Sequence, residues 1–544
     1  MGGLAPLLGS LAEAYKNLDG SWGKRTLTVV LCLLAVARVA HAHFNLSLLR
    51  CGDEYGYIFY SFDDLAAGLS GIRAPGFPLV VNAYELIFPH FGFWPEFQVS
   101  LWAAAVIWLY CALVDFDVRR LVAFSISAPL FLSGPALSGA SYICSDGMAA
   151  TFLTATVAAF LAARRTKSGF RLTVLAAFVL MTVLIRPAFL PIIPIVAIAW
   201  IVVTPFVAEG TAARFGWQSL AVAGLVLVLP LAVFVGARYV LTGHLGLAAF
   251  SQFLLAGHTT AYLKDSHLPY FDSEVRGFAA TILERRARLD SPCALAPSDN
   301  VGTSSAGAWM RPVRLEHRCY GPWYHTAMLA VIEHGSGKLP LADAGGTYTP
   351  WPATGSSAQS PPLPKARVGD PDPWSWGGDR WLHEEIFRSR DGKPAAYFDS
   401  LLGRYNKVVL EHESGMYLRW IAGETVIASG VIKDYLVRSR AVRWGGVTAM
   451  ILAVAGLLTI AIRPGRASIY VRALFRRPDV GERVMAVFGI CVPALVIGLT
   501  ITIVYIYVRY VDAPAVFVPS LVGLVNLRLA DAWMEALNER LTAG

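Results

Sequence analysis

Ten runs of apolar residues, each long enough to cross a lipid bilayer, recur along the chain, and the last is the least convincing of them. A soluble globule of 544 residues would need more surface charge than the 15% of charged residues found here beside 55% of hydrophobic ones. The pattern predicts an α-helical polytopic membrane protein with about ten transmembrane helices. The runs lie near residues 26–44, 97–115, 120–140, 147–163, 171–185, 188–206, 216–240, 443–462, 484–508 and 514–530.

The basic residues between these runs predict the orientation. With the N-terminus placed in the cytoplasm, sixteen Lys and Arg residues fall in cytoplasmic segments and only five in short outer segments. The net charge of +8 therefore indicates topology and not a nucleic-acid partner. We expect a multi-pass protein of the cytoplasmic (inner) membrane.

The spacing of the runs divides the chain into three parts. Residues 1–256 form an N-terminal transmembrane module with a first outer loop at 45–96, in which juxtamembrane helices are expected at about 54–69 and 76–88. Residues 257–440 form a large periplasmic insert, expected to be α/β or irregular, with helical stretches at 272–289 and 381–390. Residues 441–544 hold the C-terminal transmembrane segments and a cytoplasmic tail.

Three outer segments carry candidate chemistry. The first outer loop contains Cys51-Gly52-Asp53-Glu54 and then Arg73-Ala74-Pro75-Gly76-Phe77-Pro78. Ser145-Asp146 begins the fourth run, and Ile185-Arg186-Pro187 separates the fifth run from the sixth. The charge count places all three segments on the outer side.

In these segments the chain resembles the GT-C class of integral-membrane glycosyltransferases, in the bacterial branch of protein mannosyltransferases and the aminoarabinose transferase. The family typically has an acidic pair after the first span and an Arg-x-Pro-Gly-Tyr-Pro-like segment in the same loop. Phe77 stands where Tyr is usual, and Ala74 stands where some relatives have a second proline. The resemblance covers roughly residues 26–240 and implies an inverting enzyme with a polyprenyl-phosphate sugar donor.

The chemistry of such a transfer gives these residues roles. The acceptor hydroxyl needs a general base, for which Asp53 is the first candidate and Glu54 the substitute, with Asp146 in support. The donor phosphate needs cations or amide donors near the membrane surface. Arg186 is the leading candidate for this role, followed by Arg73, Arg238 and Lys264.

Each candidate also has a structural interpretation. Asp53-Glu54 is compatible with an ordinary polar helix start, and Ser145-Asp146 is a good N-cap signal. Arg186 before a proline is compatible with a side chain that extends to the membrane surface. Sequence alone leaves these alternatives open.

The seven cysteines show no C-x-x-C spacing, so no cysteine-based metal site is expected. Whether the site binds a divalent cation is left open, because a pair of acidic residues can bind an ion as well as act as a base. Cys293 and Cys319 lie in the insert, where oxidising conditions favour a disulfide. A pairing of Cys51 with Cys144 is a weaker alternative.

Two other functions compete with the transferase. A lipid or polysaccharide transporter or flippase would have charged and helix-breaking residues near the middles of several spans, and few are present beyond Arg38. A non-enzymatic assembly or sensor protein would use the insert as a binding module. For a transferase, a glycan, a lipid or a protein all remain possible acceptors, and the sugar is not specified.

Overall fold

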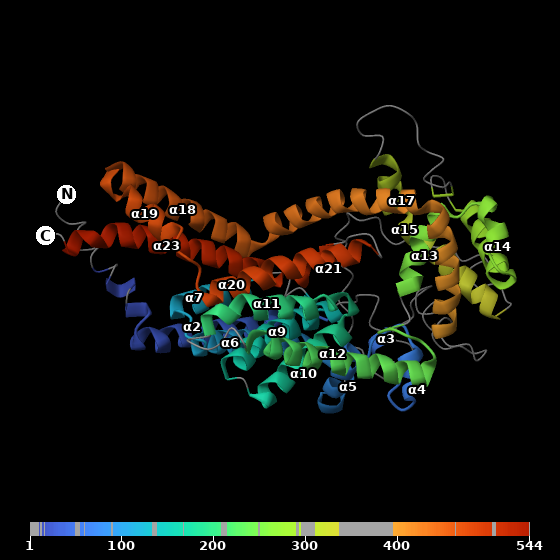
Figure 1. Cartoon of the computed structure of the whole chain (residues 1–544), viewed down its shortest axis with the longest axis horizontal. Helices are drawn as coiled ribbons and strands as arrows, with labels where there is room; N and C mark the ends of the chain where they lie inside the picture. Colours follow the sequence, from blue (N-terminus) through green and yellow to red (C-terminus); the bar gives the residue numbers. More distant parts are fainter. Residues whose placement is uncertain are drawn as a thin grey trace.

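The computed structural model describes residues 10, 13–15, 17–48, 55–58, 60–88, 91–132, 139–166, 168–207, 215–248, 251–289, 293–294, 310–336, 395–462, 464–502 and 508–542. Within them every regular element is a helix. Figure 1 shows an elongated molecule with both termini at one end of a helical bundle and a group of helices from residues 251–438 at the other. We call these the terminal end and the insert end.

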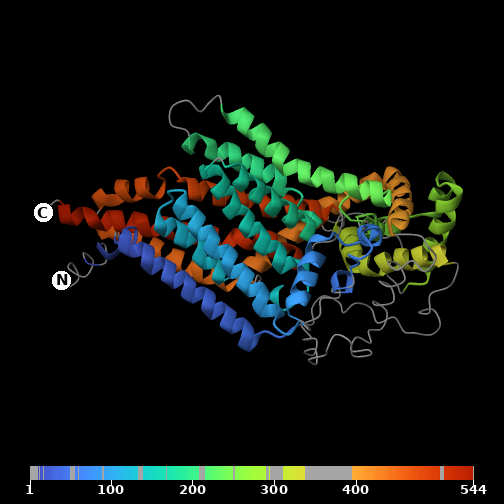
Figure 2. The ribbon, with the colours of Figure 1, turned by 90° about the horizontal axis from the view of Figure 1, so that it is seen from below.

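The described parts of the ten predicted apolar runs lie almost entirely on helices, which confirms the helical class. The helices are α2 (Ser21–Asn45), α6 (Trp94–Asp115), α7 (Arg120–Phe131), α9 (Ser145–Thr166), α10 (Gly169–Ile185), α11 (Ile192–Val207), α12 (Phe215–Thr242), α18 (Arg440–Ile462), α20 with α21 (Val480–Ala486 and Val492–Ile501, joined by a π turn), and η8 with α23 (Pro514–Phe517 and Val518–Thr542). Figure 2 shows α2 and α12 on opposite flanks of this bundle.

Six of the described helices are long and apolar enough to cross a membrane, so the protein is membrane-embedded. They are Arg25–Asn45, Trp94–Asp115, Ser145–Thr166, Arg440–Ile462, Val480–Ile501 and Pro514–Leu537. The runs on α7, α10, α11 and α12 form shorter apolar helices. Pro129 lies inside α7, and its missing N–H weakens the helix near its end.

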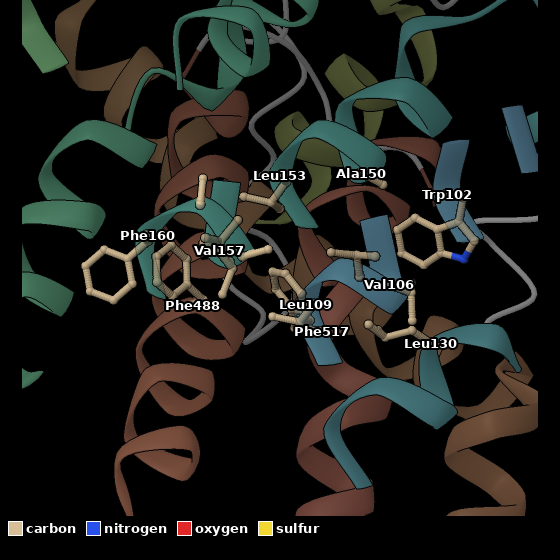
Figure 3. Close-up of a cluster of buried hydrophobic side chains, with 14 of the residues drawn as sticks. Trp102, Val106, Leu109, Leu130, Ala150, Leu153, Val157, Phe160, Phe488 and Phe517 are labelled. Atoms are coloured by element: carbon tan, nitrogen blue, oxygen red, sulfur yellow. The ribbon is translucent and has the colours of Figure 1, made fainter. Parts of the chain in front are cut away.

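The bundle core is built around α9. Small residues on this helix, such as Ala150, Ala158 and Ala159, are fully or almost fully buried, and they let neighbouring backbones approach closely, as in many membrane bundles. Larger side chains then fill the spaces between helices. Phe160 of α9 meets Phe488 of the π turn with ring centroids 5.9 Å apart (Figure 3).

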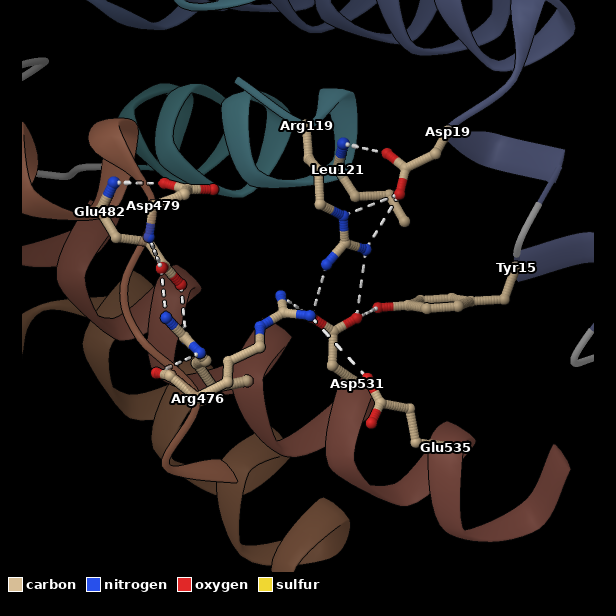
Figure 4. Close-up of polar contacts among 10 residues, drawn as sticks. Tyr15, Asp19, Arg119, Leu121, Arg476, Asp479, Glu482, Asp531 and Glu535 are labelled. Atoms are coloured by element: carbon tan, nitrogen blue, oxygen red, sulfur yellow. Dashed lines mark hydrogen bonds and ion pairs between the residues drawn. The ribbon is translucent and has the colours of Figure 1, made fainter. Parts of the chain in front are cut away.

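A network of polar and charged side chains holds several segments together at the terminal end (Figure 4). The carboxylate of Asp531 on α23 accepts hydrogen bonds from Arg119 at 2.8 Å, Arg476 at 2.6 Å and Tyr15 at 2.6 Å. Arg119 also bonds Asp19 at 3.0 Å. Segments from both halves of the chain are therefore joined at this end.

The insert is helical and not α/β, which corrects the expectation for its described part. It begins within α13 (Ser251–Tyr262) and continues with η3 (Asp265–Tyr270), α14 (Ser273–Ala287), α15 (Met310–Ser336) and α17 (Ala395–Arg438). Helix α14 confirms the helix predicted at 272–289, whereas the predicted helix at 381–390 lies outside the described residues. The long helix α17 bends at Glu413 and leads back to the bundle, where α18 follows (Figure 1).

The first loop contains α3 (Tyr55–Ile58), α4 (Leu65–Ser70) and α5 (Gly76–Ile87). Helix α5 confirms the juxtamembrane helix expected at 76–88. The helix expected at 54–69 is instead two short helices. All three lie toward the insert end of the bundle (Figure 1).

Candidate functional site

Asp146 and Arg186, predicted from separate segments, form an ion pair through Asp146 Oδ1 and Arg186 Nη1. Asp146 lies in the first turn of α9, and Arg186 directly follows the last residue of α10. Each side chain is only 13% exposed, so the pair is largely shielded from water, which strengthens its attraction. The two predicted bases Asp53 and Glu54 lie outside the described residues.

The Arg73–Pro78 segment is held against the end of α10 by a close backbone approach. A Cβ atom at Gly76 would come within 2.5 Å of the carbonyl carbon of Leu184 and 2.6 Å of the nitrogen of Ile185. No side chain fits there, so a glycine is required. This contact places the beginning of α5 beside the residue that precedes Arg186.

Tyr57 of α3 connects this segment with α9. Its hydroxyl donates a hydrogen bond of 3.4 Å to Ser145 Oγ, and the guanidinium of Arg73 lies over its ring, 4.8 Å from the centroid. The ring of Phe77 packs edge-on against Tyr57 at 4.7 Å. Phe77 is fully buried, so this position accommodates a phenylalanine. Arg73 and Asp146 are thus linked through Tyr57 and Ser145.

Helix α22 (Val508–Asp512) brings residues to the site that the sequence did not point to. The guanidinium carbon of Arg186 lies 5.4 Å from the centroid of the Tyr510 ring, within the range of a cation–π contact. Burial raises the pKa of Asp512 to about 7, although the charge of Arg186 acts in the opposite direction. The available signal is that Asp512 lies two residues before a predicted span, much as Asp146 lies one residue before another.

The other two candidate cations are engaged elsewhere. Arg238 is 1% exposed and donates from Nε to the Leu69 carbonyl at 2.7 Å and from Nη1 to the Gly246 carbonyl at 2.8 Å. Lys264 forms an ion pair with Glu413 inside the insert. These contacts give both residues structural roles, and Arg186 and Arg73 remain the better candidates for a phosphate.

A disulfide, but no metal-binding cluster, is found among the residues that the structure describes. Among the residues that the structure describes, no group of three or more His, Cys, Asp or Glu side chains is arranged to hold a metal ion. The Cys293–Cys319 disulfide is present, as expected, and Cys144 is buried. Cys51 lies outside the described part of the chain.

The arrangement can bind an anion at a semi-shielded position. Arg186 offers a guanidinium held from one side by Asp146 and covered by Tyr510, with Arg73 linked to it through Tyr57 and Ser145. Comparisons of the chain with protein families, curated proteins and solved structures find no match.

Proposed function

We propose that this protein is a GT-C-type glycosyltransferase that moves a sugar from a polyprenyl-phosphate donor to a glycan, lipid or protein acceptor. The chain crosses the cytoplasmic membrane about ten times, and the four shorter apolar helices count among these crossings. Residues 257–440 form a domain outside the membrane, on the same side as the site. The donor reaches the site sideways from the bilayer, and the acceptor comes from the periplasm or the cell exterior.

The distribution of charge supports this orientation. Residues of the predicted cytoplasmic set, including Arg119 and Arg476, meet at the terminal end in the network around Asp531. Helices α3 and α5 of the first loop lie toward the insert end (Figure 1), and they contact Ser145 and Ile185, the neighbours of Asp146 and Arg186 in the chain. A reporter fused after residue 147 should signal an extracytoplasmic position, and a cytoplasmic signal there would contradict the assignment.

The single observation that carries the proposal is the Asp146–Arg186 pair beside the Arg73–Pro78 segment. Three separate parts of the chain bring two cations, a carboxylate and aromatic rings together at the end of the bundle. Cations held in a position shielded from water are what a lipid-linked phosphate leaving group requires.

The reaction is a direct displacement. The acceptor oxygen forms a bond to the anomeric carbon while the bond between that carbon and the phosphate oxygen breaks, which inverts the configuration. Asp53 takes the acceptor proton, and the electron pair of the broken bond stays with the polyprenyl phosphate. Arg186 stabilises the added negative charge, and Asp146 holds Arg186 in position.

The test is release of polyprenyl phosphate from radiolabelled polyprenyl-phosphate sugars by the purified protein. Removal of one charge-stabilising donor from a transferase site typically costs about 10²–10³-fold in rate, so Arg186→Gln should lose at least about 100-fold. Asp63→Asn, at an exposed first-loop position, is the matched control. Absence of turnover with every donor, or unchanged turnover by Arg186→Gln, would overturn the proposal.

A further inference from the structure

The C-terminal part of the chain packs beside both partners of the Asp146–Arg186 pair. Helix α22 contacts α9, whose first turn contains Asp146. Helix α21 contacts the short turn η2 (Pro187–Phe189), which directly follows Arg186. The surroundings of the pair are therefore built from both halves of the chain.

Helix α22 is anchored by buried apolar residues on both sides. Val511 and Ala515 are buried in a cluster with Trp420 of α17, and Tyr510 packs against the same cluster. A few residues later, Phe517 is fully buried in the core of the bundle. The ring of Tyr510 is therefore held between two apolar cores and does not belong to a free loop.

The guanidinium of Arg186 lies over the ring of Tyr510. Its central carbon is 5.4 Å from the ring centroid, and Nη1 of the same group pairs with Asp146 Oδ1. A carboxylate attracts the N–H groups of a guanidinium by its charge, whereas an aromatic ring attracts the cation by the negative face of its π-system. Arg186 is thus restrained by two contacts of different kinds, from α9 and from α22.

We propose that Tyr510 is a further residue of the donor-phosphate site, where it holds the guanidinium of Arg186 in the position that binds the phosphate. This inference rests on the proposed transferase function and adds a residue of the C-terminal half to its site. Tyr510 is a positioning residue, since it acts on the donor through Arg186.

A ring suits this role better than a second acidic residue. An arginine side chain loses rotamer freedom when it binds a ligand, and a contact that already holds the guanidinium removes part of that cost. The ring also excludes water from one side of the cation, which strengthens the attraction for an anion. Because the ring has no net charge, it does not cancel the charge of Arg186 as another carboxylate would.

The first test measures equilibrium binding of the methyl phosphodiester of a polyprenol to the full-length protein in detergent micelles. Tyr510→Leu keeps an apolar side chain but has no ring, and it should bind about 5- to 30-fold more weakly than the wild type. Tyr510→Phe keeps the ring and should bind as the wild type does. A wild-type affinity of Tyr510→Leu, or equal losses in the two variants, would overturn the inference.

Tyr435→Leu is the matched control. Tyr435 is buried in the same cluster and bonds the Ala515 carbonyl at 3.4 Å, so its replacement loosens the packing around α22 and leaves the Tyr510 ring in place. This variant should bind the phosphodiester nearly as tightly as the wild type. A loss as large as that of Tyr510→Leu would show that packing and not the ring is responsible, and the inference would fail.

A second series changes the electron density of the ring and leaves its packing nearly unchanged. Phenylalanines with one, two or three ring fluorines are introduced at position 510 of the full-length protein. Each fluorine withdraws electron density from the face of the ring, so the affinity for the phosphodiester should fall stepwise toward that of Tyr510→Leu. A purely structural role would give equal affinities, and equal or rising affinities along the series would overturn the inference.

A comparison of binding with turnover lets the two proposals fail separately. With an active donor, the KM for the donor should rise in the same order of variants. If no donor is turned over while binding still depends on the ring, the transferase proposal fails and the role of Tyr510 in an anion site stands. If turnover occurs and neither binding nor KM depends on the ring, only the role of Tyr510 fails.

Discussion

Gly76 packs directly on Ile185, so that a Cβ atom at Gly76 would lie 2.6 Å from the Ile185 backbone nitrogen. This contact determines the distance between the first loop and the residue that follows Ile185, which is Arg186. The two segments are more than one hundred positions apart in the chain, and the site depends on their close approach.

Replacement of Gly76 by alanine should therefore damage the site without touching any charged group. The added methyl group must push α5 away from α10, and a displacement of about 1 Å can cost about 100-fold in rate. We expect Gly76→Ala to lower kcat/KM for the donor by about that factor. Gly92→Ala is the matched control, because open space surrounds its Cβ position. Equal activity of the two variants would contradict this role for Gly76.

The Asp146–Arg186 pair should behave as a unit in a double-mutant cycle. Once Arg186→Gln has removed the cation, Asp146→Asn should have little further effect on kcat/KM, and the coupling energy should be about 1–3 kcal/mol. The exposed pair of Glu284 on α14 and Arg288, which directly follows this helix, provides the control, for which the effects of the two substitutions should simply add. Additive losses at Asp146 and Arg186 would show that they act independently.

Asp399 of α17 lies at the junction between the insert and the bundle, and we expect it to make the stability of this junction depend on pH. Its carboxylate lies 3.5 Å from His244 Nε2 and accepts a hydrogen bond from the Gln252 backbone N–H at 3.2 Å. Burial raises the pKa of Asp399 from 3.8 to about 6, with the Gln252 bond and Arg238 acting in the opposite direction.

The direction of the pH effect follows from that shift. A raised folded-state pKa favours the folded form fully below pH 3.8 and loses this contribution as the pH rises through about 6. The loss is up to about 3 kcal/mol. The midpoint temperature of thermal unfolding of the wild type should therefore fall between pH 4 and 7. It should fall relative to that of Asp399→Asn, in which residue 399 is neutral throughout. Parallel profiles for the two proteins would contradict the assignment.

We expect Asp531 to stabilise the folded protein at the terminal end. Its carboxylate is almost fully buried and holds Arg119 and Arg476, each of which is one-third exposed. Asp531→Asn should lower the free energy of unfolding by about 1–3 kcal/mol, a value reduced by the partial exposure of the arginines. Glu535→Gln, at a half-exposed position on the same helix, should change it by less than about 0.5 kcal/mol. The midpoint of thermal unfolding in detergent measures both.

Much of the helical framework was predictable, because a bilayer-spanning segment requires a long apolar run. The runs at 97–115 and 171–185 match α6 and α10 within a few residues. The distribution of basic residues predicted that Asp146 and Arg186 lie on the same side of the membrane. It did not predict that the two residues are in direct contact. The insert was harder to predict, since its mixed composition does not distinguish helices from strands.

The candidate cations show where sequence reasoning failed. Arg238 and Lys264 bind Leu69 and Glu413, which are far away in sequence and could not be anticipated. Asp512 lies two residues before the last predicted span and was not among the candidates. A search for acids at the outer start of every span would have found it.

The central claim is that a general base after the first span receives the acceptor proton beside cations that hold a lipid phosphate. Its most direct test is single-turnover transfer by Asp53→Asn with a radiolabelled polyprenyl-phosphate donor. We expect the transfer rate to fall by about 10²–10⁴-fold while donor binding stays at the wild-type level. Transfer by Asp53→Asn at the wild-type rate would contradict it.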